Sequence, residues 1–210
     1  MAVNATMLEC PADGVTAFAK KLVPGTSFLT AEACASQPIL FLDVDGVLNT
    51  IACLASPKAI VMAGWPGPLS RPLLVRLGKV LQATEARIVL SSTWRLTDAG
   101  VVALMRGMEQ VGIDPISVIV GSTPSFPGGR RAHEIADWLE SYGPCAAWAA
   151  VDDLDLWSED PKRMGRHTVK TLVSSGLQQG QAQELVRILR DGGATASCEQ
   201  RARHGGSGSS

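Results

Sequence analysis

Leu40-Phe41-Leu42-Asp43-Val44-Asp45-Gly46-Val47-Leu48-Asn49 is the most informative segment of this sequence. Its apolar beginning belongs to a short continuous run, Ile39 to Leu42, which is typical of a strand that is buried on both faces of a sheet. The run ends in an acidic turn that carries Asp43 and Asp45. A buried strand followed at once by carboxylates predicts an α/β domain with polar chemistry at the edge of its sheet.

Short apolar runs recur after this segment and alternate with stretches of helical period. The first predicted helix starts near Ser70, and Asp98 is predicted to cap a second. The alternation predicts a three-layer α/β/α domain with a Rossmann-like parallel sheet. The further predicted strands are 87–90, 116–120, 146–151 and 167–170.

The domain boundaries are predicted from length and local composition. A chain of 210 residues with 46% hydrophobic content suits one domain with a sizeable core. Residues 1–36 are poorly periodic and are predicted to be a loosely ordered extension. Residues 37–191 form the predicted domain, and residues 192–210, rich in Gly, Ser, Ala and Arg, form a predicted disordered tail.

Charge and cysteine content limit the classes of partner and compartment. A formal net charge of −1 gives no broad attraction for nucleic acid, although a local basic patch stays open. The five cysteines are widely spaced, which argues against a disulfide framework or a zinc site and favours a reducing compartment. No apolar run approaches the roughly 18 residues of a membrane helix. We therefore expect a soluble, cytoplasmic protein without a membrane partner, and organelle targeting by the N-terminal segment stays open.

Polar residues follow three of the predicted strands. Besides Asp43 and Asp45, these are Ser91 and Ser92 after the second strand and the pair Asp152-Asp153 after the fourth. The carboxyl ends of parallel strands meet at one edge of an open sheet, so we expect these side chains to form one site.

This set of residues supplies what the hydrolysis of a phosphate ester requires. Asp43 is an oxygen nucleophile that can form an aspartyl-phosphate, and Asp45 can protonate the leaving alcohol and deprotonate the attacking water. Asp152 adds a hard oxygen ligand for Mg²⁺. Ser92 can donate a hydrogen bond to the phosphoryl group, and Arg131 offers a fixed positive fork at the start of a helix. The sequence therefore predicts a phosphorylated substrate and Mg²⁺ as cofactor.

The ordered motifs resemble the haloacid dehalogenase (HAD) superfamily of phosphatases. The narrower resemblance is to the small HAD domains found alone or in Swiss army knife RNA-repair proteins. It rests on Asp-Gly-Val-Leu-Asn at 45–49, Ser-Ser-Thr-Trp-Arg at 91–95, Arg131-x-x-Glu-Ile-x-x-Trp-Leu at 131–139, and Gly-Leu at 176–177.

The resemblance implies a role for each candidate residue. Asp43 would be nucleophile and metal ligand, Asp45 the acid/base and a ligand through its main-chain carbonyl, and Asp152 the third protein ligand. Asp153 would be secondary. Ser92 would bind the phosphoryl group, with Thr93 beside it. The usual basic residue of the family is a lysine, whereas this chain offers Arg130 and Arg131. We assign the role to Arg131.

Other interpretations of the same residues stay open at this point. The aspartates can serve as turn and cap residues, Ser92 as a helix cap, and Arg95 as either a substrate contact or the partner of an acid. The arginine in place of lysine motivates an alternative function, a catalytically inactive HAD-fold binding or scaffold module. A receiver domain of the response-regulator type is disfavoured. It carries an acidic pair on its first strand and its phosphorylated aspartate later in the chain, and the order here is different.

The sequence leaves little room for a cap domain over the site. About twenty residues separate Asn49 from the helix at Ser70, too few for an independently folded cap. We expect a minimal cap, at most a flap from Ile51 to Pro68, and hence an open site. Such a site suits nucleotide, nucleic-acid-end or protein phosphates, while the near-neutral charge does not favour tight binding of a polynucleotide.

Overall fold

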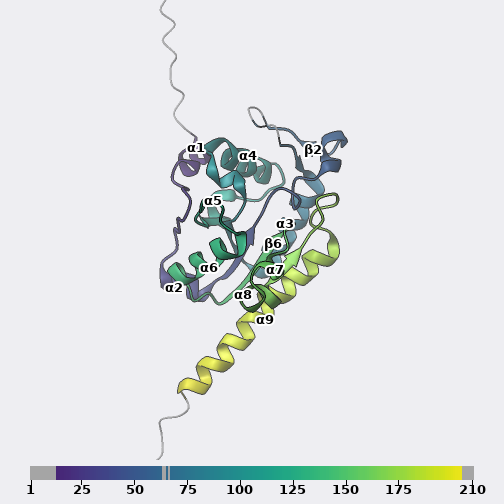
Figure 1. The fold of residues 1–210 in the computed structure, drawn as a ribbon. Coiled ribbons are helices and arrows are strands. Elements are labelled where there is room, and N and C mark those ends of the chain that lie inside the picture. The colour runs from purple at the N-terminus through teal and green to yellow at the C-terminus, as the bar shows by residue number, and fades with distance from the viewer. Residues whose placement is uncertain (1–12, 63–64, 66, 205–210) are drawn as a thin grey trace, which may run out of the picture.

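A five-stranded parallel sheet forms the centre of the protein (Figure 1). The computed structural model describes residues 13–62, 65 and 67–204, with the backbone alone at 54–55 and 193–204. The strand order is β5-β4-β1-β6-β7, and β1 pairs in parallel with both β4 and β6. The strands are β1 (Pro38–Leu42), β4 (Arg87–Leu90), β5 (Ile119–Ser122), β6 (Ala147–Asp152) and β7 (Thr168–Lys170).

Helices cover both faces of this sheet, because alternate residues of each strand point to opposite sides. Leu40 and Leu42 belong to one core cluster, and Ile39 and Phe41 belong to the other. The first cluster includes residues of α1 (Gly14–Ala19), α3 (Arg71–Thr84), α4 (Asp98–Glu109) and α9 (Gln179–His204). The second includes residues of α2 (Ala31–Ser36), α6 (Arg131–Tyr142), α7 (Leu156–Glu159) and α8 (Pro161–Met164). The predicted three-layer α/β/α architecture is confirmed.

One predicted strand and one predicted helix cap differ from the structure. The third strand, predicted at 116–120, is instead β5, preceded by the short helix α5 (Pro115–Val118). The side chain of Asp114 accepts a hydrogen bond from the Ile116 amide and Pro115 occupies the first turn, a combination that starts a helix. Helix α4 is capped by Thr97, whose hydroxyl accepts from the Gly100 amide, and not by Asp98.

The N-terminal segment is more ordered, where the structure describes it, than its sequence indicates. Helix α1 buries Val15 and Ala19, and α2 buries Cys34. Between these helices the chain runs beside β5, where the Ser122 amide donates to the Thr26 carbonyl at 2.9 Å. Residues 1–12 of the predicted extension lie outside the described residues. From Gly14 onward, tertiary contacts order a stretch that lacks periodicity of its own.

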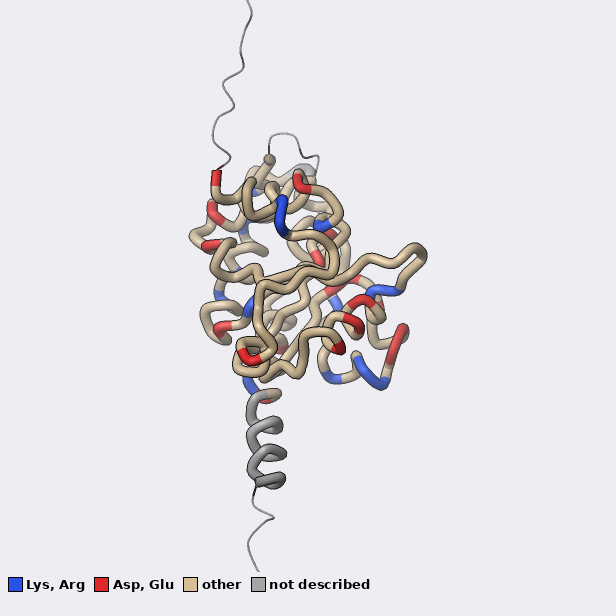
Figure 2. Tube along the Cα trace, turned by 90° about the vertical axis from the view of Figure 1, so that its left-hand side faces the viewer, with Lys and Arg blue, Asp and Glu red and all other residues tan. Residues whose placement is uncertain are grey.

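The C-terminal part also differs from the predicted boundary at 192. Helix α9 continues to His204, and residues 205–210 lie outside the described residues. Among the described helices, none combines the length and the apolarity that crossing a membrane requires. In the view of Figure 2, basic and acidic residues are interspersed along the trace.

A small flap takes the place of a cap domain. It comprises the 3₁₀ helix η1 (Ile51–Ala55) and two short strands, β2 (Ala59–Ile60) and β3 (Leu69–Ser70), which pair antiparallel. Helix α3 follows directly from β3. The minimal cap that the sequence predicts is confirmed.

Candidate active site

A tight loop at the end of β1 presents the first candidate residues. The Asp43 amide continues the sheet by donating to the Val151 carbonyl at 3.1 Å. The chain then turns, with the Gly46 amide donating to the Asn49 carbonyl at 2.7 Å. Gly46 adopts a φ of +71°, and a Cβ there would lie 2.6 Å from Cβ of Asp153. Glycine thus lets the loop turn back beside the end of β6.

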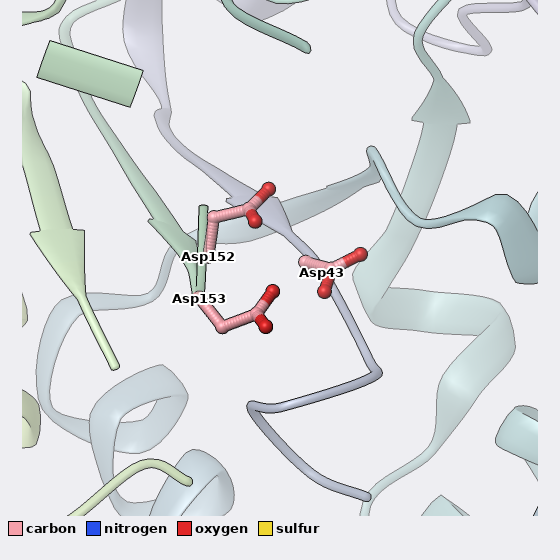
Figure 3. Close-up of side chains that lie close together, drawn as sticks. All are labelled: Asp43, Asp152 and Asp153. Atoms are coloured by element: carbon pink, nitrogen blue, oxygen red, sulfur yellow. The ribbon is translucent and has the colours of Figure 1, made fainter. Parts of the chain in front are cut away.

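Three carboxylates converge where β1 and β6 end. Asp43, Asp152 and Asp153 each offer an oxygen, and these oxygens all lie within 4.8 Å of one another (Figure 3). Asp43 is 5% exposed and Asp152 is 2% exposed. The sequence predicted Asp43 and Asp152 as metal ligands and treated Asp153 as secondary. The side chain of Asp45 is not in this group, and the ligand role predicted for its main-chain carbonyl stays a prediction.

Arg131 spans two of these carboxylates from the first residue of α6. Its Nη1 lies 2.9 Å from Asp43 Oδ1 and 2.9 Å from Asp152 Oδ2. The start of α6 is itself fixed, since the Ala132 amide donates to Glu159 Oε2 at 2.9 Å. Arg130 is exposed at the N-cap position of the helix. The structure therefore brings Arg131, and not Arg130, to the acidic group.

Burial and mutual repulsion set the charge state of this group. Burial raises the pKa of Asp43, although Arg131 opposes the effect. Burial and the neighbouring Asp43 raise the pKa of Asp152 to about 7. Burial disfavours the guanidinium of Arg131, but Asp152 and Asp43 outweigh that cost and raise its pKa. Three carboxylates thus face one guanidinium, and a bound cation would offset the burial and repulsion that disfavour their charged forms.

The two serines after β4 occupy different environments. Ser92 is completely buried, and its Oγ accepts a hydrogen bond from the Trp94 amide at 3.3 Å, which caps η2 (Thr93–Leu96). Ser91 donates its amide to the Leu42 carbonyl at 3.0 Å, which places it beside Asp43. Its hydroxyl has no hydrogen-bond partner among the described residues. Thr93 is exposed at the start of η2.

The alternation of side chains along the strands also places Ser91 and Ser92 on opposite sides of the sheet. Phe41 and Val89 point toward the layer that contains α6. Asp43 and Ser91, each two residues further on, continue the same alternation. Ser92 follows the alternation of Leu90, which belongs to the opposite core cluster. Ser91 is therefore a candidate phosphoryl donor, whereas the sequence favoured Ser92.

A buried ion pair between Arg95 and Glu134 lies next to Arg131. Arg95 Nη2 lies 2.8 Å from Glu134 Oε2, and Glu134 Oε2 also lies 3.7 Å from Arg131 Nε. Arg95 further donates to four main-chain carbonyls, those of Ser91, Ser92, Thr123 and Pro124. Of the two roles left open for Arg95, the structure supports pairing with an acid. Sequence reasoning missed the role of Glu134, whose only signal was its spacing of three residues from Arg131.

Comparison with known proteins identifies the family of the chain. No curated protein matches the chain. A solved structure described as a HAD superfamily (subfamily III A) hydrolase from Legionella pneumophila is similar at 14% identity, with a TM-score of 0.41. The similarity covers 87% of this chain and 90% of that one. Residues 39–182 match the family described as the HAD domain in Swiss Army Knife RNA repair proteins, and the chain belongs to this family.

Proposed function

We propose that this protein is a Mg²⁺-dependent phosphatase that hydrolyses a phosphate monoester through an aspartyl-phosphate on Asp43. Membership of the HAD superfamily supports a hydrolase in general. The observation that carries the finer proposal is the convergence of Asp43, Asp152 and Asp153, with Arg131 bound to the first two. The same edge of the sheet thus offers a nucleophile, cation ligands and a guanidinium.

The donor set fits a magnesium ion. Mg²⁺ prefers carboxylate oxygens, and the three carboxylates lie close enough for their oxygens to converge on one ion. Asp43 and Asp152 would hold it, with Asp153 or the Asp45 carbonyl beside them. When bound, the ion would shield the negative charge of the phosphate from the attacking carboxylate.

The residues of the chain divide the reaction between them. An oxygen of Asp43 attacks phosphorus, and the bond from phosphorus to the leaving oxygen breaks. Asp45 gives its proton to that oxygen and then takes a proton from the water that hydrolyses the acyl phosphate. Arg131 contributes fixed positive charge where charge builds up on the phosphoryl oxygens. Ser92 or Ser91 donates a hydrogen bond to the same group.

Hydrolysis of p-nitrophenyl phosphate with and without Mg²⁺ tests this proposal. We expect slow hydrolysis that EDTA and Asp43→Asn both abolish. The matched control is Asp137→Asn, since Asp137 is an exposed aspartate on α6. Activity that survives Asp43→Asn would refute the mechanism. Comparing Ser91→Ala with Ser92→Ala then identifies the phosphoryl donor. Loss of the donor should raise KM and leave the free energy of unfolding unchanged, and only one of the two variants should show this combination.

The substrate class is proposed from the open site and from the family. The flap, with its two short strands, is small compared with a folded cap domain, which favours a bulky phosphate as substrate, and the family description names RNA repair proteins. These features favour a nucleotide or a nucleic-acid end. A screen of nucleotides, phosphosugars, phosphopeptides and 3′- or 5′-phosphorylated oligonucleotides tests the choice. A clear preference for phosphopeptides would overturn it.

One observation favours the alternative of an inactive binding or scaffold module. Arg131 already pairs with both Asp43 and Asp152, so its guanidinium competes with a metal ion for their charge. The two functions differ in their response to beryllofluoride with Mg²⁺. A stable adduct on Asp43 excludes the inactive module, whereas the absence of Mg²⁺ binding supports it.

A further inference from the structure

The carboxylate of Asp45 is held at both of its oxygens. Trp94 Nε1 donates to Oδ2 at 3.0 Å, and Asn49 Nδ2 donates to Oδ1 at 2.9 Å. Asp45 is otherwise exposed, and an exposed side chain changes rotamer within picoseconds to nanoseconds unless contacts hold it. These two donors therefore restrict a group that would otherwise be mobile.

The two donors are themselves fixed. Trp94 is 3% exposed, and its ring packs edge-on against Trp65 with 4.9 Å between centroids. The backbone of Gly67 lies against both donors, since a Cβ there would come within 2.8 Å of Trp94 Cζ2 and 3.1 Å of Asn49 Nδ2. Trp94 therefore contacts both Trp65 and Gly67, and Asn49 contacts Gly67. A rigid pair of donors holds a carboxylate in one orientation without ordering either donor during the reaction.

The chemistry of the donors leaves the proton of Asp45 free for transfer. An indole N–H and an amide NH₂ only donate hydrogen bonds, so neither can accept the proton of the carboxylic acid. Each carboxyl oxygen keeps a second lone pair, where that proton can sit. We infer that Trp94 and Asn49 are positioning residues that orient Asp45 for proton transfer to the leaving oxygen and from the attacking water.

This inference rests on the proposed function, because it assigns helpers to the acid/base of that reaction. A merely structural role of Trp94 and Asn49 would not make the loss of rate depend on the leaving group. Loss of acid assistance slows the departure of a poor leaving group far more than that of a good one, because a good leaving group departs without a proton. The dependence of rate on the leaving group therefore reports on the orientation of Asp45.

The test compares p-nitrophenyl phosphate with benzyl phosphate in Trp94→Phe and Asn49→Ala. Trp94→Phe keeps an aromatic ring and removes the N–H, and Asn49→Ala removes the second donor. We expect each variant to lower kcat/KM on benzyl phosphate about tenfold and kcat/KM on p-nitrophenyl phosphate less than about threefold, because kcat/KM reports only the steps up to departure of the leaving group. The control is Trp138→Phe, since Trp138 is a core residue whose Nε1 lies 3.4 Å from the Thr26 carbonyl. It should leave the ratio of the two rates unchanged.

An Asp45→Asn background completes the test. There, Trp94→Phe should have no further effect on the ratio, because the proton that it positions is gone. If Trp94→Phe does not fold, Asn49→Ala carries the comparison, since Asn49 is only half-buried. Equal loss on both substrates, or none, overturns the inference while the proposed function stands. A wild-type protein that hydrolyses neither substrate would instead refute the proposed function.

Discussion

Arg95 and Glu134 form an ion pair of 2.8 Å in which the two side chains are 2% and 8% exposed. Arg95 lies in η2 and Glu134 lies in the first turn of α6. The pair therefore joins the segment after β4 to the helix that carries Arg131. Because Glu134 also approaches Arg131, it influences the orientation of the guanidinium in the candidate active site.

Removal of the Glu134 charge should destabilise the fold. We expect Glu134→Gln to lower the free energy of unfolding by about 3 kcal/mol, because it leaves the buried Arg95 charge without its acid. Urea denaturation measures this loss. The control is Glu140→Gln on the same helix, because Glu140 pairs with Arg163 at the surface and should contribute less than about 1 kcal/mol. Equal effects of the two substitutions would contradict this expectation.

Arg131→Ala should separate catalysis from metal binding. We expect kcat/KM to fall about 10²-fold, because a fixed positive charge near the transferring phosphoryl group is lost. The affinity for Mg²⁺ should rise in the same variant, since Asp43 and Asp152 lose their competing guanidinium. The activity of Arg131→Lys should lie between that of the wild type and that of Arg131→Ala. Arg130→Ala, an exposed neighbour, should change neither quantity, and a larger effect of Arg130→Ala would reverse the assignment.

The raised pKa of Asp152, about 7, predicts how metal binding depends on pH. The carboxyl group is largely protonated at pH 6 and must lose its proton to bind Mg²⁺, whereas at pH 8 it is already ionised. The apparent Kd for Mg²⁺ should therefore fall about tenfold from pH 6 to pH 8. Calorimetry near pH 6.5 should also detect proton release, through its dependence on the ionisation enthalpy of the buffer. An identical Kd at both pH values would exclude a titrating ligand in this range.

The same pKa has a consequence for the metal-free protein. A carboxyl group whose folded-state pKa lies above its unfolded value of 3.8 favours folding while it is protonated. Its contribution is present at low pH and is lost as pH rises from about 4 through 7. With Mg²⁺ bound, stability should instead rise with pH over the same range. Thermal unfolding at several pH values, with and without the metal, measures how stability depends on pH in each case.

Gly46→Ala should weaken the acidic group without removing a carboxylate. A Cβ at this position would lie 2.6 Å from Asp153, so either the loop or Asp153 must move. We expect about a tenfold loss of Mg²⁺ affinity together with about 1–2 kcal/mol of backbone strain. The control is Gly128→Ala, because Gly128 has a similar φ of +65° and a Cβ there would meet nothing within 4 Å. An equal loss of metal affinity in both variants would exclude a specific effect on Asp153.

The central sheet could be predicted because its strands are buried on both faces. Continuous apolar runs such as Ile39 to Leu42 and Ile88 to Leu90 have few other solutions in an α/β domain. β5 was placed too early because Ile116 is apolar but lies in a helical turn that Asp114 and Pro115 start. Local capping decided the element there, whereas hydrophobicity alone indicated a strand.

The sequence predicts which residues belong to the candidate site better than it predicts how their side chains are oriented. Strand ends place Asp43 and Asp152 together for topological reasons that the sequence order already contains. The orientation of Asp45 depends on Trp94, which is 49 residues away and lies in a short 3₁₀ turn. The choice between Ser91 and Ser92 likewise depends on which of them caps that turn. Neither contact follows from local pattern.

The segment between α1 and α2 covers one outer edge of the central sheet. β5 is an outer strand of the sheet, and an outer strand with free N–H and C=O groups can template pairing with another chain. Here the Thr26 carbonyl accepts from Ser122, and the Phe28 amide donates to Val120 at 2.7 Å. A chain that begins after residue 29 would lack both bonds. The edge at β5 would then be open to pairing with a second molecule, which would lower the colloidal stability of the truncated chain at high concentration.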